Sequence, residues 1–201
     1  EMLPQTVNAY YHPLRNEIVF PAAIMTAPFF IPGDDSVNYG GIGAIIGHEI
    51  THGFDDSGCK FDANGKMVNW WTATDKRLFD KKAAEIVYQY NQKSIEGRSL
   101  NGTLTQGENI ADIGGLKIAY KAFQKSGTRT KADNRLFFKS YAKLYRNKTT
   151  PDATKLQIDT DPHAPGQFRV DVVVSNLKEF DEAFDINWED AMYRQDKVAI
   201  W

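Results

Sequence analysis

The segment from Tyr39 to Phe54 constrains this chain most, because it is apolar and free of proline yet carries two of the four histidines. We predict that it forms one buried helix. Within it, His48-Glu49-Ile50-Thr51-His52 places two imidazoles one helical turn apart on the same face. The spacing predicts that both histidines bind one Zn²⁺ ion and that Glu49 faces its open coordination position. A histidine pair that merely ends a buried helix is the alternative, although burying these polar groups without a partner would be unfavourable.

A catalytic zinc ion usually has three protein ligands and a water molecule, so a third ligand is expected further along the chain. Glu108 and Asp112, in the segment Gly107–Asp112, are again four residues apart. One carboxylate could bind the metal while the other accepts a hydrogen bond from the far nitrogen of a ligand histidine. Thr105 and Glu108 also fit a capping box, in which Glu108 would only close a helix N-terminus. The spacing alone leaves both possibilities open.

Composition limits the classes of protein to consider. The 201 residues contain 24 Lys and Arg against 26 Asp and Glu, and 42% are hydrophobic. Such a chain can bury one substantial core, and its near-neutral balance argues against nucleic acid as the main partner. A single cysteine, Cys59, excludes an internal disulfide framework. The longest apolar tract, Ile18 to Ile31, is broken by prolines and is too short to cross a membrane.

Hydrophobic spacing predicts more helix than strand. We expect a hairpin or two short strands from two β-prone runs, Thr6 to Tyr11 and Glu17 to Phe20. A turn is expected at Asp62-Ala63-Asn64-Gly65, between Phe61 and Met67. A calcium loop starting at Asp62 is disfavoured, because its twelfth position is Ala73.

Five further segments show the spacing of a helix or a strand. Thr72 and Asp75 form a capping pattern before a long amphipathic helix. A second helix opens near Thr105, and its Gly114-Gly115 pair would let a neighbouring element approach closely. Helices are also expected near Asp133–Arg146 and Asn176–Phe184, and the alternation of Phe168, Val170, Val172 and Val174 predicts a strand.

Two weaker motifs carry other possibilities. Gly41-Ile42-Gly43 imitates a dinucleotide-binding loop, which would make the chain an oxidoreductase, but Val37–Tyr39 before it is a poor buried strand. His163 lies in the turn-forming segment Asp161–Gly166. An isolated histidine in such a loop is more typical of a surface position than of a catalytic one.

With these residues in view, the chain resembles the C-terminal catalytic domain of the neprilysin family of zinc metallopeptidases, which includes endothelin-converting enzyme and bacterial oligopeptidases. The resemblance covers nearly the whole chain. It rests on seven motifs in the order of the family: Val7–Tyr11, Asn16–Ala22, Asn38–Gly43, His48–Asp56, Gly107–Gly115, Asp161–Arg169 and Trp201.

The resemblance implies a fold and a domain organisation. The fold would be α+β and mainly helical, a thermolysin-like zincin catalytic domain with a short strand region, in which the active-site helix lies beneath a strand and the third ligand on a second helix. Residues 1–201 would form one metallopeptidase catalytic domain. The large N-terminal domain that caps the active site in the family is absent from this sequence, so the isolated domain would have doubtful activity.

The resemblance also implies roles for individual residues. It makes His48, His52 and Glu108 the ligands of one Zn²⁺ per chain, Glu49 the general base and Asp112 the partner of a ligand histidine. It makes His163 a stabiliser of the tetrahedral oxyanion. The residues that would hold the substrate backbone are Asn8, Ala9 and Arg169. The residues that would shape an apolar pocket beyond the scissile bond, or else simply belong to the core, are Ile24, Phe29, Ile45, Leu144 and Tyr145.

The resulting expectation is a zinc-dependent endopeptidase that hydrolyses short peptides on the amino side of bulky hydrophobic residues. Glu49 would assist the attack of a zinc-bound water. A zinc-stabilised peptide-binding domain, inactive without its capping domain, is the alternative. The expected partners are oligopeptides and the capping domain, without nucleic acid or a membrane segment. The single cysteine favours a bacterial, cytoplasmic member, with an exported or surface-anchored full-length protein as the alternative.

Overall fold

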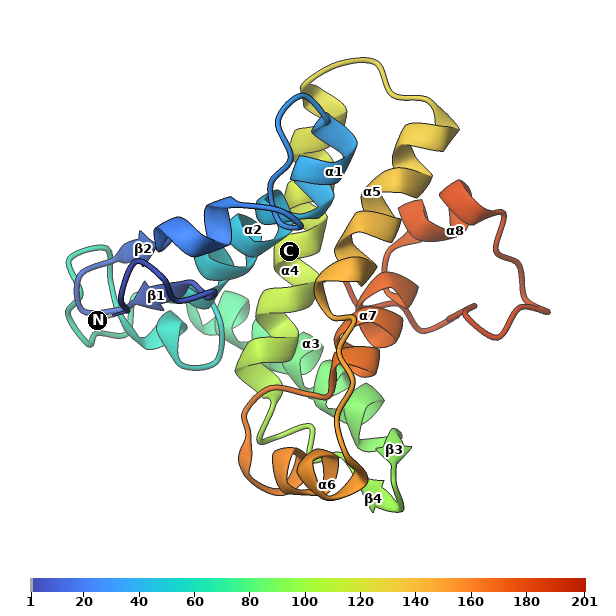
Figure 1. The fold of residues 1–201 in the computed structure, drawn as a ribbon. Coiled ribbons are helices and arrows are strands. Elements are labelled where there is room, and N and C mark those ends of the chain that lie inside the picture. Colours follow the sequence, from blue (N-terminus) through green and yellow to red (C-terminus); the bar gives the residue numbers. More distant parts are fainter. Residues whose placement is uncertain (1) are drawn as a thin grey trace.

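The central element of the fold is a long helix around which the other elements are arranged (Figure 1). The computed structural model describes residues 2–201. The helices are α1 (Asp35–Gly40), α2 (Ile42–His52), α3 (Ala73–Asn91), α4 (Gln106–Lys125), α5 (Lys131–Leu144), α6 (Pro151–Thr160), α7 (Gly166–Ser175) and α8 (Lys178–Phe184). Two short hairpins pair β1 (Tyr10–His12) with β2 (Glu17–Val19) and β3 (Ser94–Ile95) with β4 (Arg98–Ser99). The predicted mainly helical α+β class is confirmed.

Helix α4 is the central element because it is buried along most of its length. Every residue from Asn109 to Leu116 is buried. Phe123 near its end stacks on Phe137 of α5, with the ring centroids 5.4 Å apart. A helix that is covered on all sides must lie inside the fold rather than on its surface. Among residues 2–201, no helix combines the length and the apolar character that crossing a membrane requires.

The contact between α2 and α4 is a backbone contact at two glycines. A Cβ atom on Gly47 would lie 2.3 Å from the carbonyl oxygen of Gly115, and one on Gly115 would lie 2.3 Å from the backbone nitrogen of His48. Real Cβ atoms do not approach that closely, so only glycine fits both positions. The close approach predicted from Gly114-Gly115 is confirmed.

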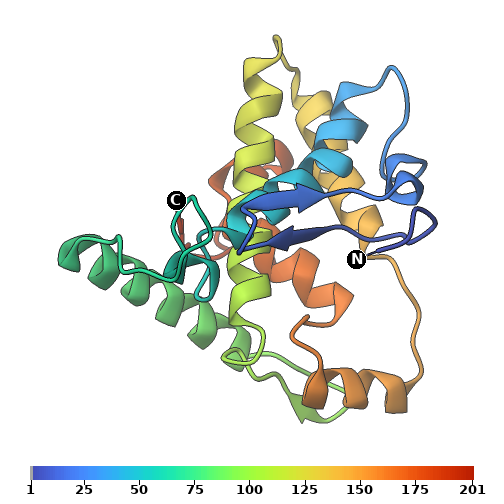
Figure 2. The same cartoon turned by 90° about the vertical axis from the view of Figure 1, so that its left-hand side faces the viewer.

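The first hairpin lies across α2, as Figure 2 shows. Strands β1 and β2 are antiparallel, with Tyr11 opposite Ile18. The predicted hairpin is confirmed. The predicted turn after Phe61 is confirmed as well, since Phe61 and Met67 form a β-bridge and Asp62 Oδ1 accepts hydrogen bonds from two backbone N–H groups within the turn.

Side chains cap the starts of α3, as predicted, and of α5, where no cap was predicted. The Thr72 side chain accepts a hydrogen bond from the Asp75 backbone N–H, 3.1 Å away, at the start of α3. Thr130 and Asp133 form a reciprocal capping box at the start of α5. Side-chain oxygens thus satisfy donors that have no partner within the helix. The predicted helices from Thr72, from Thr105 and near Asp133 are confirmed.

The expectation of one helix from Tyr39 to Phe54 is wrong in one respect, because the chain breaks at Gly41 between α1 and α2. The segment around Phe29 crosses there, and its carbonyl accepts a hydrogen bond from Ile42 N at 2.7 Å. A Cβ atom on Gly41 would lie 2.4 Å from that same carbonyl oxygen. The crossing segment therefore ends one helix and starts the next.

The predicted strand from Phe168 to Val174 is also wrong, since Gly166–Ser175 forms helix α7. Its buried apolar side chains include Phe168, Val172 and Val173, whose i, i+4, i+5 spacing places them on one helical face. Pro165 precedes the first turn, a position that proline favours. Packing against the core outweighs the β-propensity of the valines. The helix expected near Asn176–Phe184 is confirmed as α8.

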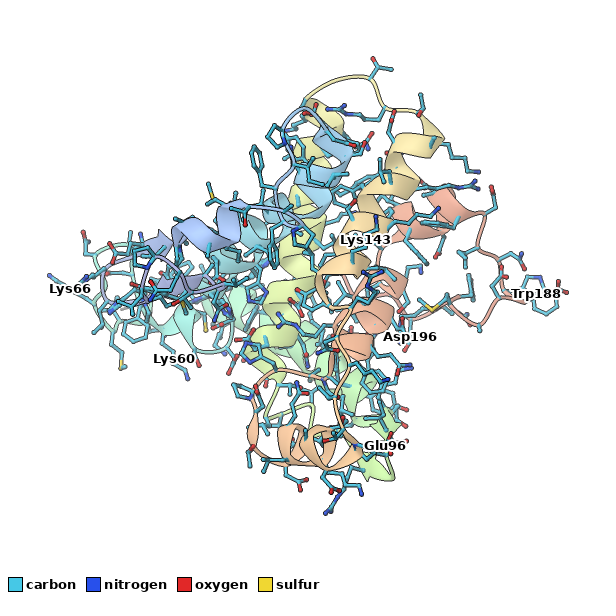
Figure 3. All side chains as sticks on the ribbon, in the orientation of Figure 1. Lys60, Lys66, Glu96, Lys143, Trp188 and Asp196 are labelled. Atoms are coloured by element: carbon cyan, nitrogen blue, oxygen red, sulfur yellow. The ribbon has the colours of Figure 1, made fainter. Side chains whose placement is uncertain are left out.

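Beyond α8 the chain extends away from the body of the molecule. Figure 3 shows Trp188 at the outer end of this segment, and its side chain is 77% exposed. The segment then returns to place Val198 and Ile200 in the core.

The glycine contact predicts a large effect of one methyl group. Gly115→Ala should lower the free energy of unfolding by about 2 kcal/mol or more, because α2 and α4 must separate. Gly127→Ala is the matched control, since its Cβ would meet only the Arg129 side chain at 3.7 Å. That change should stay within about 0.5 kcal/mol. Urea unfolding measures both, and an equal loss in the two variants would contradict the close-approach explanation.

Candidate metal centre and active site

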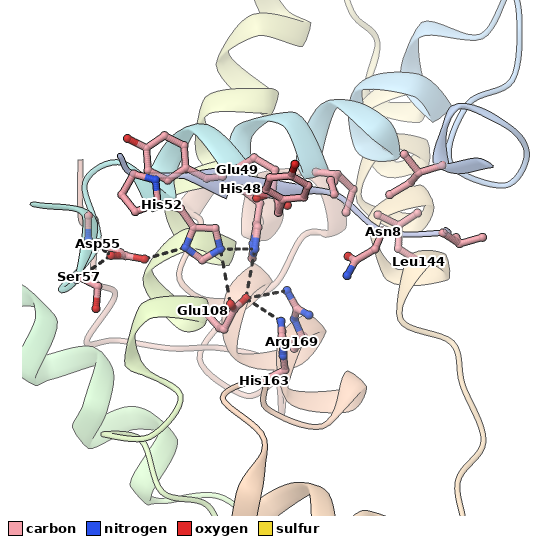
Figure 4. A pocket seen from close by; sticks show the side chains of 18 of the residues that line it. Asn8, His48, Glu49, His52, Asp55, Ser57, Glu108, Leu144, His163 and Arg169 are labelled. Carbon is pink, nitrogen blue, oxygen red and sulfur yellow. Dashed lines mark hydrogen bonds and ion pairs between the residues drawn. The ribbon is translucent and has the colours of Figure 1, made fainter. Parts of the chain in front are cut away.

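Helix α2 presents the two histidines of the pentapeptide on one face, as predicted. Their Nε2 atoms lie 2.9 Å apart (Figure 4). Ligand atoms of His48, Glu49 and His52 all lie within 4.8 Å of one another. His48 and Glu49 are buried, with 7% and 5% of their surface exposed. The turn of α2 that follows the glycine contact therefore gathers three potential metal ligands or proton acceptors.

Helix α4 adds the carboxylate of Glu108 to this group. Its Oε2 lies 3.2 Å from His48 Nε2 and its Oε1 lies 3.6 Å from His52 Nε2. Oε2 is buried, and although the Nε2 atoms of His48 and His163 lie 3.2 Å from it, neither forms a hydrogen bond of regular geometry with it. Two imidazole nitrogens and one carboxylate are the donor set of many catalytic zinc sites. The convergence of these donors on one point, with a buried oxygen left unsatisfied, fits a zinc ion.

The capping-box alternative for Glu108 is wrong. The Thr105 side chain caps no backbone N–H of α4. Its hydroxyl oxygen instead accepts a hydrogen bond from the Asn109 side chain at 2.8 Å. Burial opposes the ionisation of Glu108, yet its contacts with His163 and His48 hold its pKa well below the usual range. Glu108 therefore faces the histidines as a carboxylate.

Asp112 binds the far side of the first histidine. His48 Nδ1 lies 2.8 Å from Asp112 Oδ1. Arg169 donates two hydrogen bonds to the same carboxylate, from Nε at 2.7 Å and from Nη2 at 2.8 Å. Burial of Asp112 opposes its charge, but Arg169 and His48 lower its pKa to about 2. The structure thus brings Asp112 to the histidine. It also engages two of the three guanidinium nitrogens of Arg169, Nε and Nη2, in hydrogen bonds to Asp112.

The second histidine has a carboxylate partner that is not among the residues predicted from the sequence. His52 Nδ1 lies 2.7 Å from Asp55 Oδ2. Asp55 is 5% exposed and lies in the loop that follows α2. The available signal was an aspartate three residues after the second histidine of the motif.

His163, predicted on residue grounds alone to be an ordinary loop histidine, lies close to Glu108. It is in the loop between α6 and α7, and its Nε2 is 3.2 Å from Glu108 Oε2. Its Nδ1 lies 2.7 Å from Asp161 Oδ1. The contact with Glu108 raises the pKa of His163, and burial offsets part of that rise. Burial also raises the pKa of Glu49, against the opposing effect of the two histidines on α2.

A cleft of about 490 Å³ opens over this group. All eight residues predicted to hold substrate line it: Asn8, Ala9, Ile24, Phe29, Ile45, Leu144, Tyr145 and Arg169. Tyr145 is more than an apolar wall, because its hydroxyl donates a hydrogen bond to Asp112 at 3.3 Å and the Arg169 guanidinium lies 4.7 Å from its ring centroid. The dinucleotide alternative loses its structural basis, since the element before Gly41 is helix α1 rather than a strand.

Comparison with known proteins places this geometry in a family. The sequence pattern of peptidase family M13 matches residues 8–200. The chain is 43% identical over 212 residues to Neprilysin-3 of Drosophila melanogaster and 43% identical over 211 residues to Endothelin-converting enzyme 1 of Bos taurus. Both alignments cover 100% of this chain but only 27% and 28% of those relatives.

Solved structures show the same fold. The zinc metalloprotease Zmp1 of Mycobacterium tuberculosis, in complex with an inhibitor, matches with a TM-score of 0.94 at 41% identity over 98% of this chain. PepO of Lactobacillus rhamnosis matches with a TM-score of 0.90 at 40% identity over 94% of this chain. The match covers 32% of the Zmp1 chain and 30% of the PepO chain. The chain therefore spans between a quarter and a third of the length of these relatives.

The buried Asp112–Arg169 pair predicts a pH dependence of stability. The folded-state pKa of Asp112, about 2, is below the value of an unfolded aspartate, so its carboxylate stabilises the fold at neutral pH. That contribution is lost as the pH falls from about 4 to about 2. Asp112→Asn should lower the unfolding free energy at pH 7 by about 3 kcal/mol or more, because Arg169 stays buried without its partner.

Urea unfolding of the metal-free protein across this pH range provides the measurement. The stability of the wild type should fall more steeply than that of the variant between pH 4 and pH 2. Parallel curves would show that Asp112 does not carry the shifted pKa.

Proposed function

This chain belongs to peptidase family M13, and on that premise we propose that it hydrolyses short peptides with one zinc ion held by His48, His52 and Glu108. The observation that carries the proposal is the convergence of these three donors beside Glu49 in a cleft large enough for a peptide. The zinc metalloprotease Zmp1, with the same fold and 41% identity, supports the choice of metal.

The residues around the metal centre have complementary tasks in this reaction. A bound zinc ion supplies Lewis-acid activation of water and of the peptide carbonyl. Glu49 takes a proton from the attacking water and passes it to the departing amine, and the rise in its pKa on burial suits it to both steps. His163 in its protonated form donates a hydrogen bond to the carbonyl oxygen as negative charge develops there. The contact that raises its pKa, with Glu108, favours that form.

The cleft supports a preference for bulky apolar residues just after the cleaved bond. Its apolar wall consists of Ile24, Phe29, Ile45, Leu144 and the ring of Tyr145. Asn8 and Ala9 precede β1 at the edge of the cleft, where an extended peptide could pair with them. Arg169 retains an N–H group beyond those bound to Asp112, and this group can bind a substrate carbonyl.

We further propose that residues 1–201 are the catalytic domain of a longer polypeptide, in which another domain caps the cleft and restricts access to small peptides. The support is the length of the relatives, of which this chain spans 27% and 28%. The alternative is a domain that binds peptides on a zinc-stabilised site without cutting them. The two functions differ in what they require of Glu49.

Replacement of Glu49 separates hydrolysis from binding. Glu49→Gln should lower kcat by roughly a hundredfold to ten-thousandfold with zinc still bound, because the proton acceptor is lost. Glu85→Gln, an exposed glutamate on α3, should leave the rate unchanged. Peptide turnover and zinc content are measured on the same preparations. Unchanged turnover in zinc-loaded Glu49→Gln would remove the general-base role.

Metal content tests the ligand set. Elemental analysis should find one zinc per chain in the wild type and less than a tenth of that in His52→Ala, since two remaining ligands bind zinc weakly. His12→Ala is the matched control, because His12 lies on β1 and does not line the cleft. Full zinc retention in His52→Ala would place the metal elsewhere.

A further inference from the structure

The carboxylate of Asp55 is held between a ligand histidine and the backbone of its own loop. Its Oδ2 lies 2.7 Å from His52 Nδ1. Its Oδ1 accepts hydrogen bonds from the backbone N–H groups of Ser57 at 2.8 Å and Gly58 at 2.7 Å. The dashed lines in Figure 4 show this bridge beside the metal centre. Each oxygen thus has a separate partner, one on the histidine and one in the loop.

The loop fixes Asp55 independently of the histidine. It folds back on the end of α2 so tightly that a Cβ atom on Gly58 would lie 1.8 Å from the carbonyl oxygen of His52. The backbone carbonyl of Asp55 also accepts a hydrogen bond from Cys59 N at 3.0 Å. The side chain of Asp55 is only 8% exposed, and its carboxylate cannot turn away without breaking these contacts. Asp55 is therefore a fixed acceptor toward which the imidazole must orient.

The two histidine–carboxylate pairs differ in charge. Arg169 neutralises Asp112 through two hydrogen bonds. Among residues 2–201, the ion pairs of Asp55 include no lysine or arginine, and its other hydrogen-bond donors are neutral backbone groups. In the described part of the chain, the ion pair of Asp55 is therefore with His52. A carboxylate partner of this kind fixes the tautomer of a ligand histidine and makes its other nitrogen a better electron donor.

We propose that Asp55 is the positioning residue of the second ligand histidine: it accepts the Nδ1–H of His52 and thereby turns an unprotonated Nε2 toward His48 and Glu108. The inference rests on the metal centre proposed above. This role goes beyond shaping the loop, because the hydrogen bonds to the loop backbone use only the Oδ1 atom of Asp55. Histidine orientation requires Oδ2 and its charge.

Asparagine at position 55 separates the two tasks. Asp55→Asn keeps an oxygen that can accept the two backbone N–H groups of the loop, but it presents an NH₂ group to His52 Nδ1. An NH₂ group favours the opposite tautomer, with the proton on Nε2, the nitrogen that faces the metal. Asp56→Asn is the matched control, because Asp56 is the next residue and its carboxylate has no hydrogen bond to either histidine on α2.

Zinc affinity and histidine NMR test the proposal. Competition with a chromophoric chelator should show a 10- to 100-fold rise in the zinc dissociation constant of Asp55→Asn and no change in Asp56→Asn. The urea midpoints of the two metal-free variants should agree, which separates this effect from loop damage. In the zinc-loaded wild type, ¹⁵N-edited spectra should show a proton on His52 Nδ1, shifted downfield by its hydrogen bond to the carboxylate.

Three results would overturn the proposal. One is wild-type zinc affinity in folded Asp55→Asn, and another is a loss of affinity that merely follows a lower urea midpoint. The third is a zinc-loaded wild type without a proton on His52 Nδ1, which decides the matter even when the variant does not fold. A wild type that binds no zinc would refute the proposed metal centre together with this inference, whereas the first three results leave that centre intact.

Discussion

The contact between the backbones of α2 and α4 is the constraint on which the site depends. With no side chain at Gly47 or Gly115, the two helices approach until a Cβ atom would collide with the opposite backbone. His48 follows Gly47 directly on α2. Asp112 and Glu108 precede Gly115 by three and seven residues on α4, so they lie on the face that meets α2. The glycines therefore bring His48 within 2.8 Å of Asp112, which is 64 residues further along the chain, and within 3.2 Å of Glu108.

The same contact creates an electrostatic problem that the surrounding residues solve. It buries two imidazoles and several carboxylates in a small volume, and buried charges without partners are strongly unfavourable. Asp112 is balanced by Arg169 from α7, and Glu108 by the histidines that surround it. The helical conformation of residues 166–175 thus matters for the site. One face of this helix packs its apolar side chains into the core, and Arg169 on the same helix reaches Asp112.

The helices and strands that could be predicted from the sequence are those whose signal lies within a few neighbouring residues. Caps at Thr72 and Thr130, the first hairpin and the histidine pair are each encoded within a few residues. The break at Gly41 and helix α7 were not, because a crossing segment and core packing decide them. The site divides in the same way. Spacing alone left Glu108 as either a cap or a ligand, and the family resemblance assigned it as a ligand. The structure places Glu108 beside the histidines and reveals Asp55, which neither spacing nor resemblance had singled out.

The apolar pocket and the metal centre are joined through one side chain. Tyr145 contributes its ring to the cleft wall, its hydroxyl to Asp112 and its π-face to Arg169. Asp112 in turn fixes His48. A change at Tyr145 therefore reaches the imidazole of His48 through a single intervening carboxylate. Leu144, the adjacent wall residue, has no polar side-chain group with which to do so. Under the proposed function, a change at Leu144 would therefore alter the cleft wall alone, whereas a change at Tyr145 would alter both the cleft wall and the contacts of Asp112 with His48.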